Sequence, residues 1–272
     1  MSIAAEKLAH HDPIWAALRK EAAKLADAEP ALASFAHAIV LKHERLEDAL
    51  SYLLANKLGC DDLSPMLVRE IFQEAFKADP AIGAAVRADL SAVFERDPAD
   101  QSYAQAFLFF KGFHALQCYR IAHWLWTQGR KPMALFFQNR VSDLFAVDIH
   151  PAAKIGRGIM MDHATGIVIG ETAVVEDDVS MLHGVTLGGT GKQKGDRHPK
   201  IRRGVLLSVG AKVLGNIEVG EYSRVGAGSL VLKPVAPHCT VAGVPARVIG
   251  CRCPERPSQE MDQFIEDDGK SG

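Results

Sequence analysis

A six-residue spacing of branched apolar side chains constrains this chain more than any other feature. The spacing slips by two residues after Met161 and by eight after Leu187. A period of six matches neither the 3.6-residue repeat of a helix nor the two-residue repeat of a strand. It is typical of a parallel β-helix, in which short strands and turns stack coil on coil. The thirteen positions in frame are Ile149, Ile155, Met161, Ile169, Val175, Met181, Leu187, Ile201, Leu207, Val213, Val219, Val225 and Val231.

The two slips in this frame predict two loops. Three hexads usually form one coil, so the pattern predicts about four coils and a remainder. Extra residues in a tight coil must bulge outward, at residues 162–166 (DHATG) and again at residues 188–200 (GGTGKQKGDRHPK). Loops on a stiff scaffold often carry function. Both loops hold polar side chains that the coils lack.

The composition of the chain changes near residue 146. Eleven of the twelve Phe and all three Trp precede this point, but only four of the 23 Gly do. Aromatic side chains fill the spaces between helices, whereas a β-helix needs small turn residues. We therefore expect an α+β protein with an α-helical domain over residues 1–146 and a left-handed β-helix over 147–250. The polar, acidic residues 251–272 are expected to form a flexible tail.

Proline punctuates the helical half. Five Pro residues follow a side chain that can cap a helix, which predicts a helix start at each one and six or seven helices in all. Gly59 and Gly129 are the expected stops. The five pairs are Asp12-Pro13, Glu29-Pro30, Ser64-Pro65, Asp79-Pro80 and Asp97-Pro98.

Charge and hydropathy exclude several classes of partner. The formal net charge of −2 gives no reason to expect binding to nucleic acid or to an anionic membrane. No apolar stretch approaches the ~20 residues that span a bilayer. The N-terminus lacks the order of a signal peptide, so a cytoplasmic protein is expected. The cysteines are scarce and odd in number, which favours reduced thiols over a disulfide framework: Cys60, Cys118, Cys239, Cys251 and Cys253.

The first loop places a histidine near two carboxylates. Fifteen residues separate Asp148 from His163, so the two lie near the same corner on neighbouring coils. A carboxylate there can hold one imidazole nitrogen and leave the other free as a general base. Alternatively, Asp148 closes the turn into the coil and His163 is simply exposed. The residues alone leave both interpretations open.

The second loop is dense in charge and glycine. A guanidinium such as Arg197 can hold a substrate carboxylate through two hydrogen bonds. The glycines let backbone N–H groups approach a ligand closely. The run GGTGK lacks the spacing of a Walker phosphate loop, and no helix follows it.

Four motifs carry a resemblance to the serine acetyltransferase family. They are VDIHPAAKIGRGIMMDHATGIVIGETAVV, VTLGGTGKQKGDRHPKIRRGV, GAKVLGNIEVG and AGVPAR, and the FERDPA and YRIAHWLW segments of the helical half are also similar. The hexads and AGVPAR occur in many acyltransferases of this fold, whereas the two loops together are specific. The resemblance implies transfer of the acetyl group of acetyl-CoA to the hydroxyl of L-serine. The product is O-acetyl-L-serine, the first intermediate from serine toward cysteine.

The resemblance also implies residue roles. His163 would be the general base, and Asp148 would orient it, without a covalent intermediate. The amino and carboxylate groups of serine would be bound by Asp97, Asp162, Arg197 and His198. Acetyl-CoA, the co-substrate, would lie in the groove between adjacent rods, at Gly189, Thr190, Val209, Ala227 and Arg247.

Assembly and regulation follow from the same resemblance. It implies a homo-oligomer, either a trimer or a dimer of trimers, in which free cysteine inhibits by occupying the serine site. The C-terminal tail of the family docks into cysteine synthase through a terminal isoleucine. This chain ends in Lys270-Ser271-Gly272 with Ile265 as its nearest isoleucine, which argues against that complex.

Three alternatives stay in view. The acceptor could be another hydroxylated molecule, such as homoserine or a galactoside. The chain could instead be mainly a scaffold that regulates cysteine synthase. Three histidines of the coil region (His150, His183 and His238) resemble the zinc ligands of γ-class carbonic anhydrases, but they occupy different frame positions. No metal site is therefore predicted, either there or at Cys251-x-Cys253.

Overall fold

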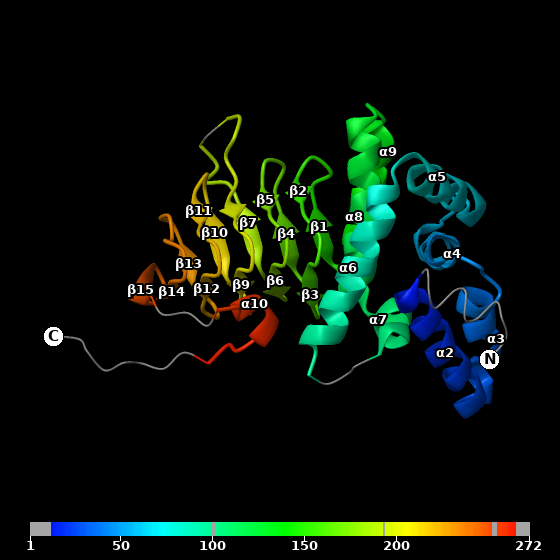
Figure 1. The fold of residues 1–272 in the computed structure, drawn as a ribbon. Helices are drawn as coiled ribbons and strands as arrows, with labels where there is room; N and C mark the ends of the chain where they lie inside the picture. Colours follow the sequence, from blue (N-terminus) through cyan, green and yellow to red (C-terminus); the bar gives the residue numbers. More distant parts are fainter. Residues whose placement is uncertain (1–11, 99–101, 193, 252–254, 265–272) are drawn as a thin grey trace.

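The computed structural model describes residues 12–98, 102–192, 194–251 and 255–264 of the chain. Helices occupy the first half and a rod of short strands the second (Figure 1). None of the described helices combines the length and the apolar character needed to cross a membrane. The helices before the rod are α2 (Pro13–Ala28), α3 (Pro30–Ala36), the π-helical turn η1 (His37–Leu41), α4 (Leu46–Leu58), α5 (Pro65–Ala78), α6 (Pro80–Arg96), α7 (Tyr103–Phe109), α8 (Lys111–Thr127) and α9 (Lys131–Phe145).

Four of the five proline signals begin helices, as predicted. Pro13, Pro30, Pro65 and Pro80 are the first residues of α2, α3, α5 and α6, and the side chain before each accepts a backbone N–H of the first turn. Gly59 follows α4 directly, and Gly129 follows α8 by two residues. The described residues before the rod form eight α-helices, more than expected, because α3 and α7 have only seven residues each.

The prediction that Asp97-Pro98 starts a helix is wrong. Asp97 instead follows the last residue of α6, with extended backbone angles (φ −84°, ψ 111°). A proline disfavours helical angles in the residue before it, so this pair ends a helix as readily as it begins one. The next helix, α7, starts at Tyr103, and Ser102 caps it.

The second half of the chain is the predicted parallel β-helix. Its strands lie in three sheets and make about five turns, against the four and a remainder expected from the hexads. Sheet A holds β1 (Val147–Ile149), β4 (Ile167–Ile169), β7 (Thr186–Gly188), β10 (Lys212–Leu214) and β13 (Leu230–Val231). Sheet B holds β2 (Lys154–Ile155), β5 (Val174–Val175), β8 (Lys200–Ile201) and β11 (Glu218–Val219). Sheet C holds β3 (Met160–Asp162), β6 (Ser180–Leu182), β9 (Leu206–Leu207), β12 (Arg224–Val225), β14 (Thr240–Gly243) and β15 (Ala246–Gly250).

Strand register confirms the six-residue frame and both slips. In sheet A, Ile149 pairs with Ile169, which pairs with Leu187, which pairs with Val213. These steps span 20, 18 and 26 residues, so the slips of two and eight fall where the frame predicts them. The paired side chains are buried and stack along the axis of the rod.

The helical half covers the first coil of the rod. Helix α9 packs against β1, and α8 packs against β1 and β3. Buried polar side chains join the two halves, because Asp89 of α6 accepts the N–H of Ile159 and Arg120 of α8 donates to the carbonyl of Gly156. Asp89 and Arg120 also form an ion pair of 2.7 Å. One continuous apolar core runs through both halves.

The last turn of the rod departs from one prediction. Strands β14 and β15 form an antiparallel hairpin, and a disulfide joins Cys239 to Cys251 at its open end. The expectation of reduced thiols is therefore wrong for these two residues. The hairpin comes after the last residue of the six-residue frame, so the spacing does not show that its two ends meet. Cys60 and Cys118 are free thiols, and Cys253 lies outside the described residues.

Part of the segment expected to be a flexible tail is a short helix on the rod. Helix α10 (Pro257–Glu260) packs against α6 and β9, and Ser258 within it is buried. Arg224 of β12 donates to the backbone carbonyls of Asp262 and Phe264. The end of the chain, including Ile265, lies outside the described residues.

Candidate active site

One edge of the rod is a column of stacked turns, which we call the His163 edge. It connects sheet C to sheet A and comprises residues 163–166, 183–185, 208–211 and 226–229. Each turn donates one backbone hydrogen bond to the turn before it, at 2.7–2.9 Å. These bonds run from Gly166 to Ala146, from Gly184 to Thr165, from Gly210 to His183 and from Gly228 to Val209.

His163 stands exposed at the start of this column. Its backbone is left-handed (φ 53°), and 76% of its side chain is exposed. Its Nε2 atom lies 3.8 Å from Oδ2 of Asp162, and its ring meets the ring of His183 edge to face at 6.0 Å. The conformation turns the imidazole outward, where a substrate can reach it.

Two carboxylates lie beside the imidazole. Burial raises the pKa of Asp162, the neighbouring His163 lowers it, and the charge of Asp97 raises it. Asp97 comes from the end of α6 and Asp162 from the end of β3, so the helical half and the coil together form the pair. A pair of carboxylates beside an exposed imidazole is suited to bind an ammonium group.

Helix α8 supports this loop from behind. A Cβ atom added at Gly112 would lie 2.1 Å from the carbonyl oxygen of Met161 and 3.0 Å from Cβ of Ala164. Lys111 donates a hydrogen bond to the hydroxyl of Thr165. The helix therefore approaches the loop as closely as it does only because residue 112 is glycine.

In the described residues Asp148 has a partner other than His163. Asp148 lies on the outward face of β1, and its Oδ1 accepts a hydrogen bond from Nε2 of Gln138 at 2.7 Å. The carbonyl of Ala146, two residues before Asp148, accepts the backbone N–H of Gly166 in the His163 loop. The strand that carries Asp148 therefore begins beside this loop. In the described part of the chain, the carboxylate that lies within ion-pair distance of His163 belongs to Asp162.

The loop with the guanidinium lies on another edge, which we call the Arg197 edge. It connects sheet A to sheet B, and its described residues are 150–153, 170–173, 189–192, 194–199 and 215–217. The long loop between β7 and β8 projects from the rod here (Figure 1). The backbone N–H groups of Arg197 and His198 both donate to the hydroxyl of Thr172, at 2.9 and 3.1 Å.

The two charged residues of this loop have different environments. Arg197 donates from Nη2 to Glu171 at 2.7 Å, and this hydrogen bond lowers the pKa of Glu171. His198 is buried against Gly170, and its Nδ1 accepts the N–H of Thr172. Burial lowers the pKa of His198, and the charge of Arg197 lowers it further. The loop thus presents one guanidinium, paired with a carboxylate, beside an imidazole whose pKa is lowered.

The predicted site residues therefore fall into two groups in a single chain. Asp162 and His163 lie at the His163 edge, where the charge of Asp97 acts on Asp162, and Arg197 and His198 lie at the Arg197 edge. Asp148 is on β1, next to Gln138. Four of the five residues expected to contact CoA divide in the same way. Val209 and Ala227 are stacked in the His163 column, Gly189 and Thr190 are in the long loop, and Arg247 is exposed on β15.

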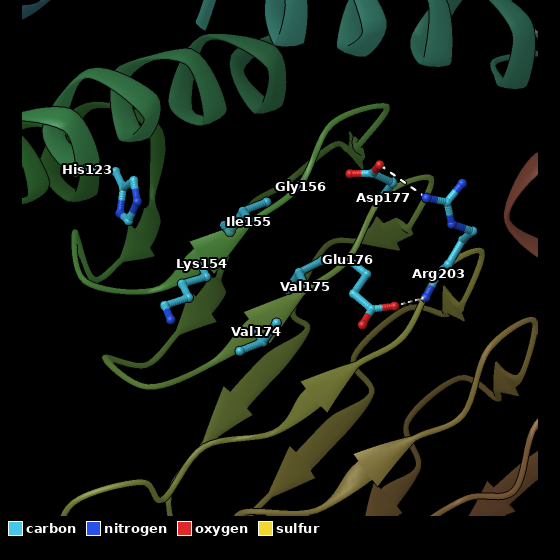
Figure 2. Close-up of a pocket in the computed structure, with 9 residues that line it drawn as sticks. All are labelled: His123, Lys154, Ile155, Gly156, Val174, Val175, Glu176, Asp177 and Arg203. Carbon is cyan, nitrogen blue, oxygen red and sulfur yellow. Dashed lines mark hydrogen bonds and ion pairs between the residues drawn. The ribbon is translucent and has the colours of Figure 1, made fainter. Parts of the chain in front are cut away.

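Two cavities are lined by none of the predicted site residues. One of about 410 Å³ opens over sheet B and is lined by residues that include His123, Lys154 and Arg203 (Figure 2). A second, of about 370 Å³, shares His123 with it and lies under α6 and α8. In the described ranges, His, Cys, Asp and Glu side chains form no cluster of three suited to a metal ion. The candidate site is thus an exposed surface of the single chain.

Sequence reasoning missed three residues that hold the site. Glu171 pairs with Arg197 and Thr172 with His198, and both pairs are 26 residues apart. One coil of 18 residues plus the slip of eight gives this separation, so the frame could have identified them. Gln138, which binds Asp148, is in helix α9, and no regularity of the sequence connects it to the coil.

The fold and these two edges define an acyltransferase built on hexapeptide repeats. The family described as "Serine acetyltransferase, N-terminal" matches residues 14–118. The serine acetyltransferase of Salmonella typhimurium is 60% identical over 252 residues, which are 93% of this chain and 92% of that protein. The chain belongs to the serine acetyltransferase family.

Solved structures agree with this assignment. The crystal structure of serine acetyltransferase from Vibrio cholerae covers 93% of this chain and 98% of its own, with 58% identity and a TM-score of 0.92. A complex of serine acetyltransferase with cysteine has a TM-score of 0.91 at 54% identity, and covers 93% of this chain and 99% of its own. The Brucella abortus enzyme in complex with coenzyme A has a TM-score of 0.87 at 53% identity, covering 88% of this chain and 96% of its own.

Proposed function

We propose that this chain transfers the acetyl group of acetyl-CoA to the hydroxyl of L-serine, with His163 as the general base. The observation that carries the proposal is an exposed imidazole beside two carboxylates, in a chain that matches serine acetyltransferases along nearly its whole length. The products are O-acetyl-L-serine and CoA.

The proposed reaction needs one proton relay and no covalent enzyme intermediate. Nε2 of His163 removes the proton of the serine hydroxyl as the oxygen attacks the thioester carbonyl. The C–S bond then breaks, and the imidazolium returns the proton to the CoA thiolate. The Asp148 carboxylate breaks its hydrogen bond with Gln138 and rotates toward the imidazole ring. In that position it stabilises the imidazolium.

Serine is held by its two charged groups. Asp97 and Asp162 attract the ammonium group, and Arg197 binds the carboxylate after exchanging Glu171 for the ligand. His198 donates a hydrogen bond from the neutral ring. Cysteine carries the same ammonium and carboxylate with a thiol in place of the hydroxyl, which supports the proposal that it inhibits by occupying this site.

The separation of the two edges supports a homo-oligomer. The His163 edge of one copy, placed against the Arg197 edge of the next, would complete the serine site. It would also enclose a groove in which CoA contacts Val209 and Ala227 of one chain and Gly189 and Thr190 of the other. A closed ring of three copies satisfies this contact on every subunit.

The test is the release of CoA with purified protein and a panel of acceptors. L-Serine should give turnover, and L-homoserine and galactosides should give much less. Turnover with one of the other acceptors and not with serine would overturn the proposed substrate. Full assembly without turnover on any acceptor would instead favour a scaffold that regulates cysteine synthase.

A further inference from the structure

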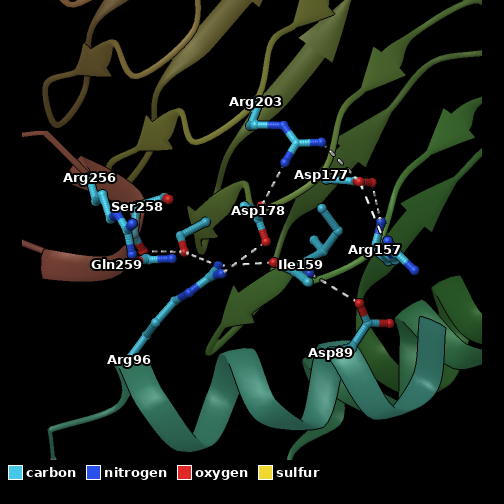
Figure 3. A network of polar contacts seen from close by, with 12 residues as sticks. Asp89, Arg96, Arg157, Ile159, Asp177, Asp178, Arg203, Arg256, Ser258 and Gln259 are labelled. Carbon is cyan, nitrogen blue, oxygen red and sulfur yellow. Dashed lines mark hydrogen bonds and ion pairs between the residues drawn. The ribbon is translucent and has the colours of Figure 1, made fainter. Parts of the chain in front are cut away.

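Arg96 is a buried cation that the reaction does not use. It is the last residue of α6, and only 2% of its side chain is exposed. Nη1 donates to the carbonyl of Gly158 and to the hydroxyl of Ser180, each at 3.0 Å, and Nη2 lies 3.7 Å from Asp178 (Figure 3). A buried guanidinium is costly to leave without partners, so these contacts fix the end of α6 on the coil.

The residue that follows this anchor is Asp97. The chain leaves the helix there, because Asp97 has extended backbone angles and precedes a proline. Its charge acts on Asp162 across the junction of helix and coil. The distance between the two carboxylates therefore depends on where Arg96 holds the end of α6.

Ser180 connects this anchor to the C-terminal segment. Its hydroxyl accepts from Arg96 and donates to the backbone carbonyl of Ser258 in α10, at 2.7 Å. Ser180 has no exposed surface, and Ser258 is 1% exposed. The hydroxyl is thus shared between the end of α6 and the helix seated next to it (Figure 3).

We infer that Arg96 is a positioning residue for Asp97, and that Ser180 transmits the seating of α10 to it. The inference rests on the proposed role of Asp97 in binding the serine ammonium. Arg96 contacts no substrate. It sets the spacing of Asp97 and Asp162, and so sets the affinity for serine without changing the reacting atoms.

Arg120 provides a matched control. It is also a buried arginine at the junction of helix and coil, and it donates to the carbonyl of Gly156, two residues before the one that Arg96 binds. Its neighbours in the chain are not site residues. Both Arg120→Met and Arg96→Met should therefore loosen the junction of helix and coil. Only Arg96→Met should displace Asp97.

The experiment compares KM for serine, KM for acetyl-CoA, kcat and thermal unfolding of the full chain. Arg96→Met should raise KM for serine roughly tenfold, the scale of a sub-ångström misplacement of a binding group. KM for acetyl-CoA and kcat should stay within about twofold. Arg96→Lys should restore part of the affinity, and Ser180→Ala should raise KM for serine about threefold. Arg120→Met should lower the unfolding temperature and leave KM for serine unchanged.

Asp97→Asn separates the two proposals. If it leaves KM for serine unchanged, Asp97 does not bind the ammonium, and the proposed function loses that contact. If Asp97→Asn raises KM for serine while Arg96→Lys and Ser180→Ala leave it at the wild-type value, the inference about Arg96 is wrong and the proposed role of Asp97 stands. An equal rise in Arg120→Met also overturns the inference. In the Asp97→Asn background, Arg96→Met should cause no further rise in KM for serine. If Arg96→Met does not fold, the KM values of Arg96→Lys and Ser180→Ala test the inference instead.

Discussion

The loops at His163 and at Arg197 carry the two halves of the same proposed site, and they are held in different ways. The His163 loop rests on the helical half, where Gly112 and Lys111 of α8 contact it. The Arg197 loop is held by the coil itself, through the hydroxyl of Thr172 and an ion pair of 2.5 Å between Lys200 and Asp196. One loop is positioned by packing and the other by hydrogen bonds.

This difference assigns a separate task to each loop. The reacting imidazole needs a fixed place, and a helix behind the loop provides it. The guanidinium must exchange its partner Glu171 for a substrate carboxylate, which a loop held by a few polar contacts allows. Changes behind the His163 loop should therefore act on kcat, and changes in the Arg197 loop on KM for serine.

The largest effect is expected from His163→Ala. Loss of the general base should lower kcat by at least ~10²-fold. Because the side chain is mostly exposed, the unfolding temperature and the assembly state should not change. Steady-state release of CoA and size-exclusion chromatography check both expectations. A variant that keeps more than a tenth of wild-type kcat would remove His163 from the reaction.

Mixing two inactive variants tests whether the two edges meet between copies. At a serine concentration well below the wild-type KM, His163→Ala and Arg197→Ala should each be nearly inactive alone, the first through kcat and the second through KM for serine. Mixed in equal amounts during refolding or coexpression, they should recover about a quarter of wild-type activity, because one interface in four receives both intact edges. Absence of any recovery, with mixed oligomers shown by mass spectrometry, would place both residues in a site within one chain.

Thr172→Val tests the loop held by hydrogen bonds. It removes the hydroxyl that accepts from Arg197 and His198 and keeps the shape of the side chain. KM for serine should rise about tenfold, because the guanidinium loses its fixed position, while kcat changes little. Thr127→Val, at the end of α8, is the matched control and should leave both constants unchanged. A fall in kcat alone would contradict the separate task of this loop.

Gly112→Ala tests the loop held by packing. The added methyl group collides with the carbonyl of Met161, so the free energy of unfolding should fall by about 1–3 kcal/mol. The loop should shift, and kcat should fall severalfold, with a smaller rise in KM for serine because Asp162 directly follows Met161. Gly83→Ala in α6 is the control, because the atom it meets is the flexible end of Glu47. Equal losses in both variants would show that helix α8 has no special relation to the loop.

The smallest effect concerns the pH dependence of serine binding. Burial raises the pKa of Asp162, His163 lowers it, and the negative charge of Asp97 raises it. Removing that charge in Asp97→Asn lets the pKa of Asp162 fall, so its carboxylate forms at lower pH. On acidification, the dissociation constant for serine should therefore begin to rise at a lower pH than in the wild type, although the affinity itself is reduced. A pH dependence of serine binding that stays the same as in the wild type would show that the two carboxylates do not interact.

The hexad frame predicted the coil, both loops and the register, because each branched side chain stacks on its equivalent in the next coil. The same frame also predicts that Glu171 and Thr172 lie beside Arg197 and His198, one coil and one slip further along the chain, which the motifs alone did not indicate. The frame cannot predict the contacts of Gln138 or Arg96, because contacts between a helix and the coil do not recur at a regular sequence spacing. Asp97-Pro98 was misread for a related reason, since the same dipeptide suits either end of a helix.

The closing hairpin has a consequence for the length of the rod. Parallel strands leave N–H and C=O groups unsatisfied on the final winding, and such an edge can recruit another chain. Here β15 runs back along β14 and occupies that edge of sheet C, while α8 and α9 shield the opposite end. The hairpin thereby closes the last open edge of sheet C to strands of another copy.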